Sequence, residues 1–186
     1  MRQRPSNWPS NICYLDKNAY HSSVTTAVKS QILSPSSASQ TDPGTACKVA
    51  IRRIQDSAHP ANGQYGLFAG KKIPSGTFII DYIGEVHCDD RPDSDYDLSL
   101  LRLSDGTSVG VDASRMGNEA RFVNDYRGIK KKPNAVFTDY RTRSGELRIC
   151  IRSCEEIKKG EEILVSYGKS WWSSRHEASS EINEHT

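Results

Sequence analysis

Four separated segments combine glycine, asparagine or tyrosine with an adjoining apolar stretch, a composition suited to holding a ligand against the backbone. They are residues 62–69 (NGQYGLFA), 81–85 (DYIGE), 117–135 (GNEARFVNDYRGIKKKPNA) and 159–172 (KGEEILVSYGKSWW). Glycine lets backbone groups approach a ligand closely because no Cβ intervenes. Buried polar side chains need partners, since an unsatisfied polar group costs about 1–3 kcal/mol. These segments are therefore the candidates for binding and catalysis.

Each segment also has an ordinary structural explanation when it is taken alone. Asn62-Gly63 is typical of a hairpin turn, and Tyr82 of a core residue at a strand end. Asn124 suits a turn with positive φ, and the tryptophans at 171 and 172 can simply close a core. The chemical interpretation depends on the four segments acting together.

The sequence offers no convincing catalytic dyad or metal cluster, so we expect no metal. Five cysteines lack C-x-x-C spacing, which favours free thiols in a reducing compartment, the nucleus or cytoplasm. Cys150 and Cys154 lack a second ligand pair, so structural thiols are favoured over zinc. We expect neither a signal peptide nor a membrane partner, because no apolar run reaches about 20 residues. A net charge of +2 gives no support for direct nucleic-acid binding.

Short apolar runs separated by turn signals surround these segments and predict a mainly β architecture with short helices. Strands are expected at residues 49–54, 65–69, 77–83, 98–103, 107–111, 147–152 and 162–167, with a further one beginning at Ala135. Residues 104–106 (SDG) predict a hairpin between two of these strands. Residues 89–96 form an acidic loop.

The composition divides the chain into three regions. Residues 1–46 are expected to be an extension with a Ser/Pro-rich linker, residues 47–172 a domain, and residues 173–186 a polar tail. Within the extension, apolar residues at helical spacing predict an amphipathic helix from about Tyr20 to Leu33. This helix either docks on the domain or binds a partner.

In their order along the chain, the four segments resemble the SET-domain family of protein lysine methyltransferases. Residues 62–69 resemble the family's glycine motif before a strand, and residues 82–84 resemble its Tyr-x-Gly motif. The third segment resembles Arg-Phe-x-Asn-His-x-Cys-x-Pro-Asn through Arg121, Phe122, Asn124, Pro133 and Asn134. The fourth resembles Gly-Glu-Glu-Leu-x-x-x-Tyr-Gly through Gly160, Glu161, Glu162, Tyr167 and Gly168. The resemblance covers residues from about 47 to 172.

The resemblance implies small curved sheets with a knot-like crossing of the third and fourth segments. It implies that S-adenosylmethionine binds on one face and that a peptide lysine enters a narrow channel from the other. Tyr167 would be the catalytic tyrosine, with Tyr82 a second tyrosine beside the channel. The donor would contact Gln64, Tyr65, Arg121, Phe122, Asn124, Asp125, Tyr167 and Trp172. The channel would be formed by Tyr82, Val165 and Trp171.

The sequence also departs from the family pattern. Gln64 replaces the first glycine of Gly-x-Gly, and Asp125 replaces the histidine, whose contact in relatives is largely through its main chain. Val165 stands where several relatives carry an aromatic residue that helps to set the number of methyl groups added. No cysteine follows Cys154, so we expect no zinc-binding segment after the domain. The channel wall would then be completed by the two tryptophans, the N-terminal extension or a second subunit in a homodimer.

The function implied is methyl transfer to the side-chain amine of a protein lysine, with a histone tail as the leading substrate. Two alternatives remain open at this point. Gln64 and Asp125 favour a catalytically weak or inactive SET-fold module that binds proteins, and nothing in the sequence excludes a non-histone substrate. The acidic residues 89–95 are a candidate docking surface for basic peptides.

Overall fold

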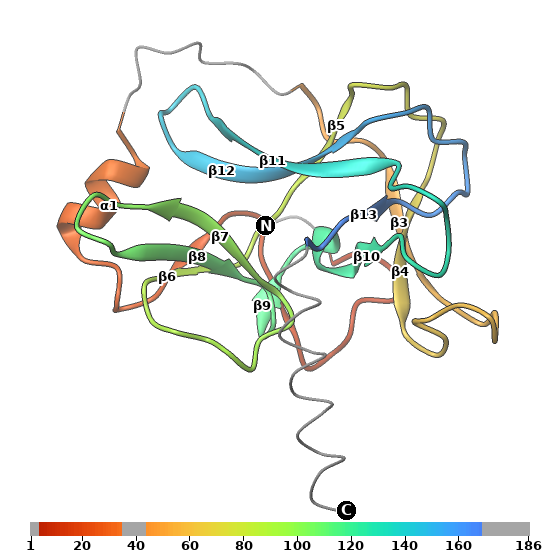
Figure 1. Cartoon of the computed structure of the whole chain (residues 1–186), viewed down its shortest axis with the longest axis horizontal. Helices are drawn as coiled ribbons and strands as arrows, with labels where there is room; N and C mark the ends of the chain where they lie inside the picture. The colour runs from red at the N-terminus through yellow and green to blue at the C-terminus, as the bar shows by residue number, and fades with distance from the viewer. Residues whose placement is uncertain (1–3, 35–43, 169–186) are drawn as a thin grey trace, which may run out of the picture.

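A computed structural model of the chain describes residues 4–34 and 44–168 (Figure 1). Its strands form small sheets of two to four members, so the expected mainly β architecture is confirmed. The elements in chain order are β1 (Cys13–Tyr14), β2 (Ala19–Tyr20), α1 (Thr26–Ile32), β3 (Val49–Arg53), β4 (Tyr65–Ala69), β5 (Phe78–Asp81), β6 (Glu85–His87), β7 (Asp97–Arg102), β8 (Ser108–Asp112), β9 (Met116–Gly117), the 3₁₀ helix η1 (Glu119–Phe122), β10 (Asn124–Asp125), β11 (Ala135–Arg141), β12 (Leu147–Ser153) and β13 (Leu164–Val165).

Three sheets provide most of the framework, with strand orders β3-β4, β11-β12-β5 and β2-β6-β8-β7. The predicted hairpin at residues 104–106 is confirmed as the antiparallel connection between β7 and β8. Gly106 has φ +90°, a left-handed conformation that glycine adopts without strain. Figure 1 shows the β11-β12-β5 sheet on one side of the molecule and the β2-β6-β8-β7 sheet on the other. The core consists largely of buried β-branched and leucine side chains from their facing surfaces.

The N-terminal segment packs on the domain. β1 pairs in parallel with β9, and β2 pairs in parallel with β6. The predicted helix is present but begins at Thr26 and not near Tyr20, because residues 19–20 are committed to strand pairing and the Thr25 hydroxyl caps the helix by accepting from the Val28 N–H. Val28 and Ile32 are buried in the common core. The docked arrangement of this helix is therefore the one observed.

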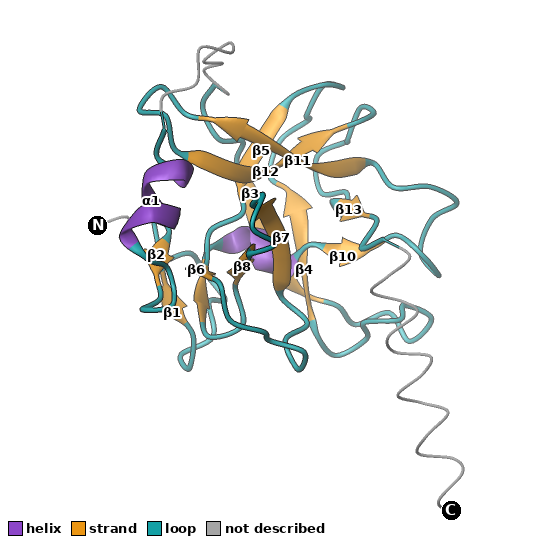
Figure 2. Ribbon diagram, turned by 60° about the vertical axis from the view of Figure 1, so that its left-hand side comes forward, coloured by secondary structure: helices purple, strands orange, loops and turns teal. Residues whose placement is uncertain are grey.

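The third and fourth segments cross at a pair of very short strands. Asn124 pairs in parallel with Leu164, and Asp125 with Val165, and Figure 2 shows β10 beside β13. The strand expected over residues 162–167 is thus limited to Leu164–Val165. Two-residue strands have little stability of their own, so buried side chains must hold this crossing together. Asn134 does so by donating from Nδ2 to the Glu162 carbonyl at 2.8 Å and accepting at Oδ1 from the Leu164 N–H at 2.8 Å.

Candidate active site

A cavity of about 1110 Å³ opens at this crossing, with walls contributed by all four segments that the sequence singled out. Of the predicted site residues, Gln64, Tyr65, Tyr82, Arg121, Phe122, Asn124, Asp125 and Tyr167 line it. Val165 is fully buried in β13 and is not among the lining residues. Trp171 and Trp172 lie outside the described residues. The aromatic walls are formed by Tyr65, Tyr82, Tyr96, Phe122, Phe137 and Tyr167.

Tyr167 is fixed at both its backbone and its hydroxyl. Its N–H donates to Asp125 Oδ2 at 2.8 Å, and its hydroxyl donates to the Val123 carbonyl at 2.8 Å. Burial and the neighbouring Asp125 carboxylate raise the pKa of the Tyr167 phenol well above its ordinary value. The side chain therefore stays a neutral phenol at physiological pH.

Tyr82 is buried at the cavity wall, and its hydroxyl is likewise held by a backbone carbonyl. Its hydroxyl donates to the Tyr96 carbonyl at 2.7 Å, and its ring meets Phe137 edge-on at a centroid distance of 5.7 Å. Burial raises the pKa of Tyr82 well above that of a free phenol. Both tyrosine hydroxyls thus donate their protons to backbone carbonyls.

Asn124 is oriented without ambiguity by its neighbours. Its Nδ2 lies 3.3 Å from the Tyr65 carbonyl oxygen and 2.8 Å from Glu162 Oε1, and two acceptors require the amide nitrogen at that position. The Asn124 Oδ1 is therefore the acceptor presented by this side chain. Because Asn124 belongs to β10, the β10–β13 pairing places it near Tyr167.

Asp125, which departs from the family pattern, links the two crossing segments through hydrogen bonds and an ion pair. Its Oδ1 accepts from the Arg127 N–H at 2.8 Å, while Oδ2 accepts from the Tyr167 N–H at 2.8 Å and pairs with the Arg127 guanidinium at 2.9 Å. The carboxylate is buried, with 7% of the side chain exposed. It thereby ties the two crossing segments together at the cavity wall.

Arg121 and Phe122 form part of the wall between the two ends of the cavity. The Arg121 guanidinium donates to the Ala113 carbonyl at 2.8 Å and lies 4.2 Å from the centroid of the Tyr96 ring. Phe122 meets Trp8 edge-on at 5.5 Å and Tyr65 at 5.8 Å. The N-terminal segment thus supports the site through Trp8.

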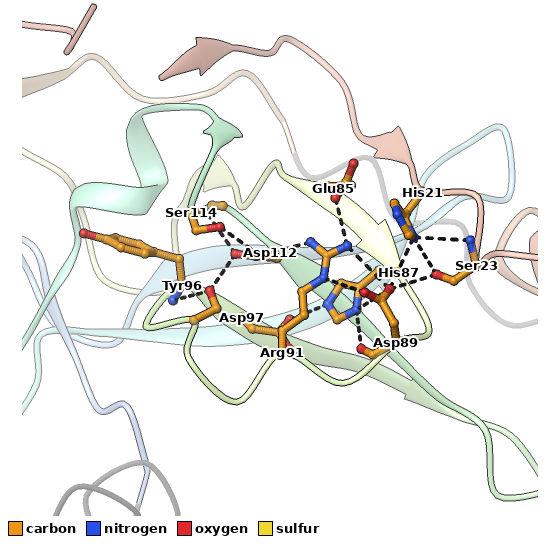
Figure 3. A network of polar contacts seen from close by, with 12 residues as sticks. His21, Ser23, Glu85, His87, Asp89, Arg91, Tyr96, Asp97, Asp112 and Ser114 are labelled. Atoms are coloured by element: carbon orange, nitrogen blue, oxygen red, sulfur yellow. Dashed lines mark hydrogen bonds and ion pairs between the residues drawn. The ribbon is translucent and has the colours of Figure 1, made fainter. Parts of the chain in front are cut away.

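A partly buried ionic network holds the loop that carries Tyr96. Figure 3 shows Arg91 between three carboxylates: Glu85 at 2.8 Å, Asp89 at 3.3 Å and Asp112 at 3.0 Å. Asp112 accepts from the Ser94 hydroxyl at 2.8 Å, and Ser94 Oγ in turn accepts from the Tyr96 N–H at 3.2 Å. The loop's acidic residues are therefore partly neutralised within the fold.

Comparison with known proteins decides the family. Residues 64–168 match the model of the SET domain, which is more than half of the chain. The chain belongs to the SET-domain family. Histone-lysine N-methyltransferase EHMT1 of Mus musculus is 30% identical over 132 residues, which cover 69% of this chain and 10% of that protein. Histone-lysine N-methyltransferase Set2 of Drosophila melanogaster is 35% identical over 114 residues, covering 55% and 4%.

Solved structures agree with this SET-domain assignment. The Chaetomium thermophilum Polycomb Repressive Complex 2 bound to GSK126 is similar with a TM-score of 0.56 and 26% identity over 73% of this chain and 18% of that one. An autoinhibited ctPRC2 bound to S-adenosylmethionine gives a TM-score of 0.55 and 26% identity over 75% and 17%. The chain thus spans only a small part of the proteins that it resembles.

Tyr96 and His59 of this SET-domain site were missed in the sequence, and Glu162 was identified only as a motif residue and not as part of the site. Tyr96 forms a wall and accepts from Tyr82, while His59 and Glu162 form a hydrogen-bonded pair behind Asn124. Only Glu162 carried a signal, as part of the fourth motif. Within the described residues, no group of three or more His, Cys, Asp or Glu could hold a metal ion. The described helices are also too short or too polar to cross a membrane.

Proposed function

We propose that this SET domain transfers the methyl group of S-adenosylmethionine to the side-chain amine of a protein lysine, with a histone tail as the leading substrate. The observation that carries the proposal is the meeting of Asn124, Tyr82 and Tyr167 on one aromatic-walled cavity. The names of the similar histone-lysine methyltransferases and the donor-bound neighbour support it.

The residues at one end of the cavity fit the donor. Asn124 Oδ1 can accept from the ammonium of its amino-acid end, and Tyr65 with its neighbouring backbone would hold the methionine part. The backbone at Asp125 would contact the adenine, and Gln64 is an exposed residue that lines the cavity. Arg121 and Phe122 would shape the wall, and Trp172 would cover the donor. When bound, the donor supplies a methyl group already activated on a cationic sulfur.

The lysine must arrive as a neutral amine. Free lysine has a pKa of about 10.4, so at neutral pH the amine form lies roughly 4 kcal/mol above the ammonium. A dry aromatic channel disfavours the charged form, and Tyr82, Phe137 and Tyr167 provide such walls. The lysine channel would run between these aromatic side chains, and Trp171 and Val165 remain predicted channel residues from the family resemblance.

Positioning supplies the remaining acceleration. The Tyr167 and Tyr82 hydroxyl groups are fixed in place by donating to the Val123 and Tyr96 carbonyls. Such oxygens can orient a methyl group by weak C–H···O contacts, and in-line alignment of the amine contributes several kcal/mol. This chemistry requires no metal and no proton-transfer dyad.

The charge at the cavity rim favours a basic peptide. Asp95 and Asp97 line the cavity, and Asp90 and Asp93 are exposed nearby. Arg91 pairs with Asp89 and Asp112, and His87 Nε2 lies 2.8 Å from Asp97 Oδ1, so the exposed Asp90 and Asp93 are the carboxylates that would meet a basic peptide. A histone tail has the complementary charge, and a nuclear or cytoplasmic location is consistent with such a substrate. A second copy of the chain could complete the channel in a homodimer. Sedimentation at the protein concentrations of the activity assay tests whether such a dimer forms.

The decisive experiment is a methyl-transfer assay with labelled donor and a histone panel, read by mass spectrometry. Tyr167→Phe removes only the hydroxyl and should lose most of the rate. Equal turnover by the variant would remove Tyr167 from the mechanism. The rate of the unaltered protein should rise with pH while amine deprotonation limits it.

The second candidate is a SET-fold module that binds proteins without catalysis, favoured by Gln64 and Asp125 in place of the family's usual residues. Calorimetry separates the two functions. Absence of heat and of a thermal shift at millimolar donor would support the binding module, and turnover of a protein outside the histone panel would support a non-histone enzyme.

A further inference from the structure

Glu162 is a buried carboxylate directly behind the cavity wall. Its side chain is 9% exposed, and its backbone is held by Asn134 and by a bridge to Phe68. The two carboxylate oxygens contact His59 and Asn124, which both line the cavity. Any effect of Glu162 on a ligand therefore passes through these two side chains.

Hydrogen-bond directions fix the charge of this cluster. The Ala61 N–H donates to His59 Nδ1 at 3.0 Å, so this nitrogen is unprotonated and the ring proton lies on Nε2. His59 Nε2 then donates to Glu162 Oε2 at 3.0 Å, and Asn124 Nδ2 donates to Oε1 at 2.8 Å. Both oxygens of Glu162 thus act as acceptors, a pattern that fits a carboxylate beside a neutral imidazole. The cluster carries one negative charge.

This charge has no cationic partner within residues 4–34 and 44–168, where no lysine or arginine forms an ion pair with Glu162. Burying an uncompensated carboxylate is unfavourable. The fold nevertheless makes room for it, since a Cβ at Gly66 would lie 2.6 Å from Glu162 Oε1. A buried negative charge in a space kept open for it indicates a cationic ligand nearby.

We propose that Glu162 is a positioning residue that supplies the counter-charge for the ammonium group of the donor, acting through Asn124. The Asn124 amide nitrogen is committed to Glu162 and to the Tyr65 carbonyl, which leaves Oδ1 for the ligand's ammonium. The negative charge polarises the amide toward accepting from a cation. The inference rests on the proposed function, because it assigns a role toward the same donor.

The test compares three adenosine ligands by calorimetry on the purified chain. S-adenosylmethionine and S-adenosylhomocysteine carry the ammonium, whereas methylthioadenosine lacks the whole amino-acid end. Glu162→Gln keeps the side-chain length, removes the charge and replaces one of the two accepting oxygens by an amide N–H, so affinity for the first two ligands should fall on the order of tenfold to a hundredfold. Affinity for methylthioadenosine should stay within about twofold. Glu161→Gln is the matched control, because the adjacent Glu161 pairs with Lys130 and neither residue lines the cavity, so this variant should change none of the three affinities.

The decisive quantity is the ratio of the affinity for S-adenosylhomocysteine to the affinity for methylthioadenosine. An unchanged ratio in Glu162→Gln, through equal losses or no loss, overturns the inference. Failure of the unaltered chain to bind any of the ligands would instead refute the proposed function. If circular dichroism shows that Glu162→Gln does not fold, Glu162→Asp replaces it. Aspartate keeps the carboxylate but is shorter by one methylene, which moves the charge away from Asn124. The ratio is then expected to fall about threefold, and an unchanged ratio overturns the inference.

Discussion

Replacing Arg91 by alanine should lower the free energy of unfolding by more than the loss of an exposed ion pair does. Arg91 is 16% exposed and bridges Glu85, Asp89 and Asp112, of which Asp112 is only 5% exposed. Removing one partner of a buried pair costs about 3–5 kcal/mol, because the other charge is left buried and uncompensated. Asp112 keeps hydrogen bonds from Ser94 and from the Ser114 N–H and hydroxyl, which offset part of that cost. We therefore expect a loss of about 2–4 kcal/mol.

Urea denaturation measures this loss as a change in the free energy of unfolding. Lys72→Ala is the matched control, because Lys72 and Glu156 pair at 2.8 Å with 63% and 51% of their side chains exposed. Such a surface pair contributes about 0–1 kcal/mol. If Arg91→Ala costs no more than Lys72→Ala, the buried network does not stabilise the fold and the reasoning is refuted.

The same variant has a defined dependence on pH. The hydrogen bonds from Ser94 and Ser114 and the Arg91 guanidinium hold the pKa of Asp112 below its usual value despite burial. A depressed carboxyl pKa contributes stability that is present above the unfolded value of about 4 and is lost as pH falls through the folded value. Without Arg91 the depression is smaller, so the stability difference between the two proteins should narrow below about pH 4. A difference that widens on acidification would contradict this account.

Three further substitutions follow from the same contacts, each measured by its urea midpoint. Asp125→Asn replaces one of two accepting oxygens by an amide NH2, so either the Arg127 or the Tyr167 N–H loses its acceptor, and the change should cost about 1–3 kcal/mol; an unchanged midpoint would contradict the structural role. Trp8→Ala removes the ring that packs on Phe122 and should cost about 2–4 kcal/mol, whereas a loss under about 1 kcal/mol would show that the N-terminal segment contributes little. Gly110→Ala would place a Cβ 2.5 Å from His87 Nε2 and should cost about 1–3 kcal/mol. An unchanged midpoint would show that the His87 ring moves aside without loss of stability.

The sequence by itself determined the elements whose signals are local. Alternating apolar residues predicted β12, the β-branched run before Tyr82 predicted β5, and Ser104-Asp105-Gly106 predicted the hairpin of β7 and β8. These succeed because side-chain periodicity and turn conformation depend on neighbouring residues alone. The order of the four motifs likewise indicated the SET-domain family from the sequence alone.

Only the tertiary structure decided which of these residues meet. The pairing of Asn124 with Leu164 has no local signal, because two-residue strands are formed by long-range contacts and by side chains such as Asn134. The same holds for the start of α1, displaced by strand pairing at Ala19. His59 reaches Glu162 across 103 positions in the chain, so neither its contact nor its neutral tautomer could be read from the residues around it. Chain order specifies local conformation, whereas the charge and geometry of the site arise only when distant segments pack together.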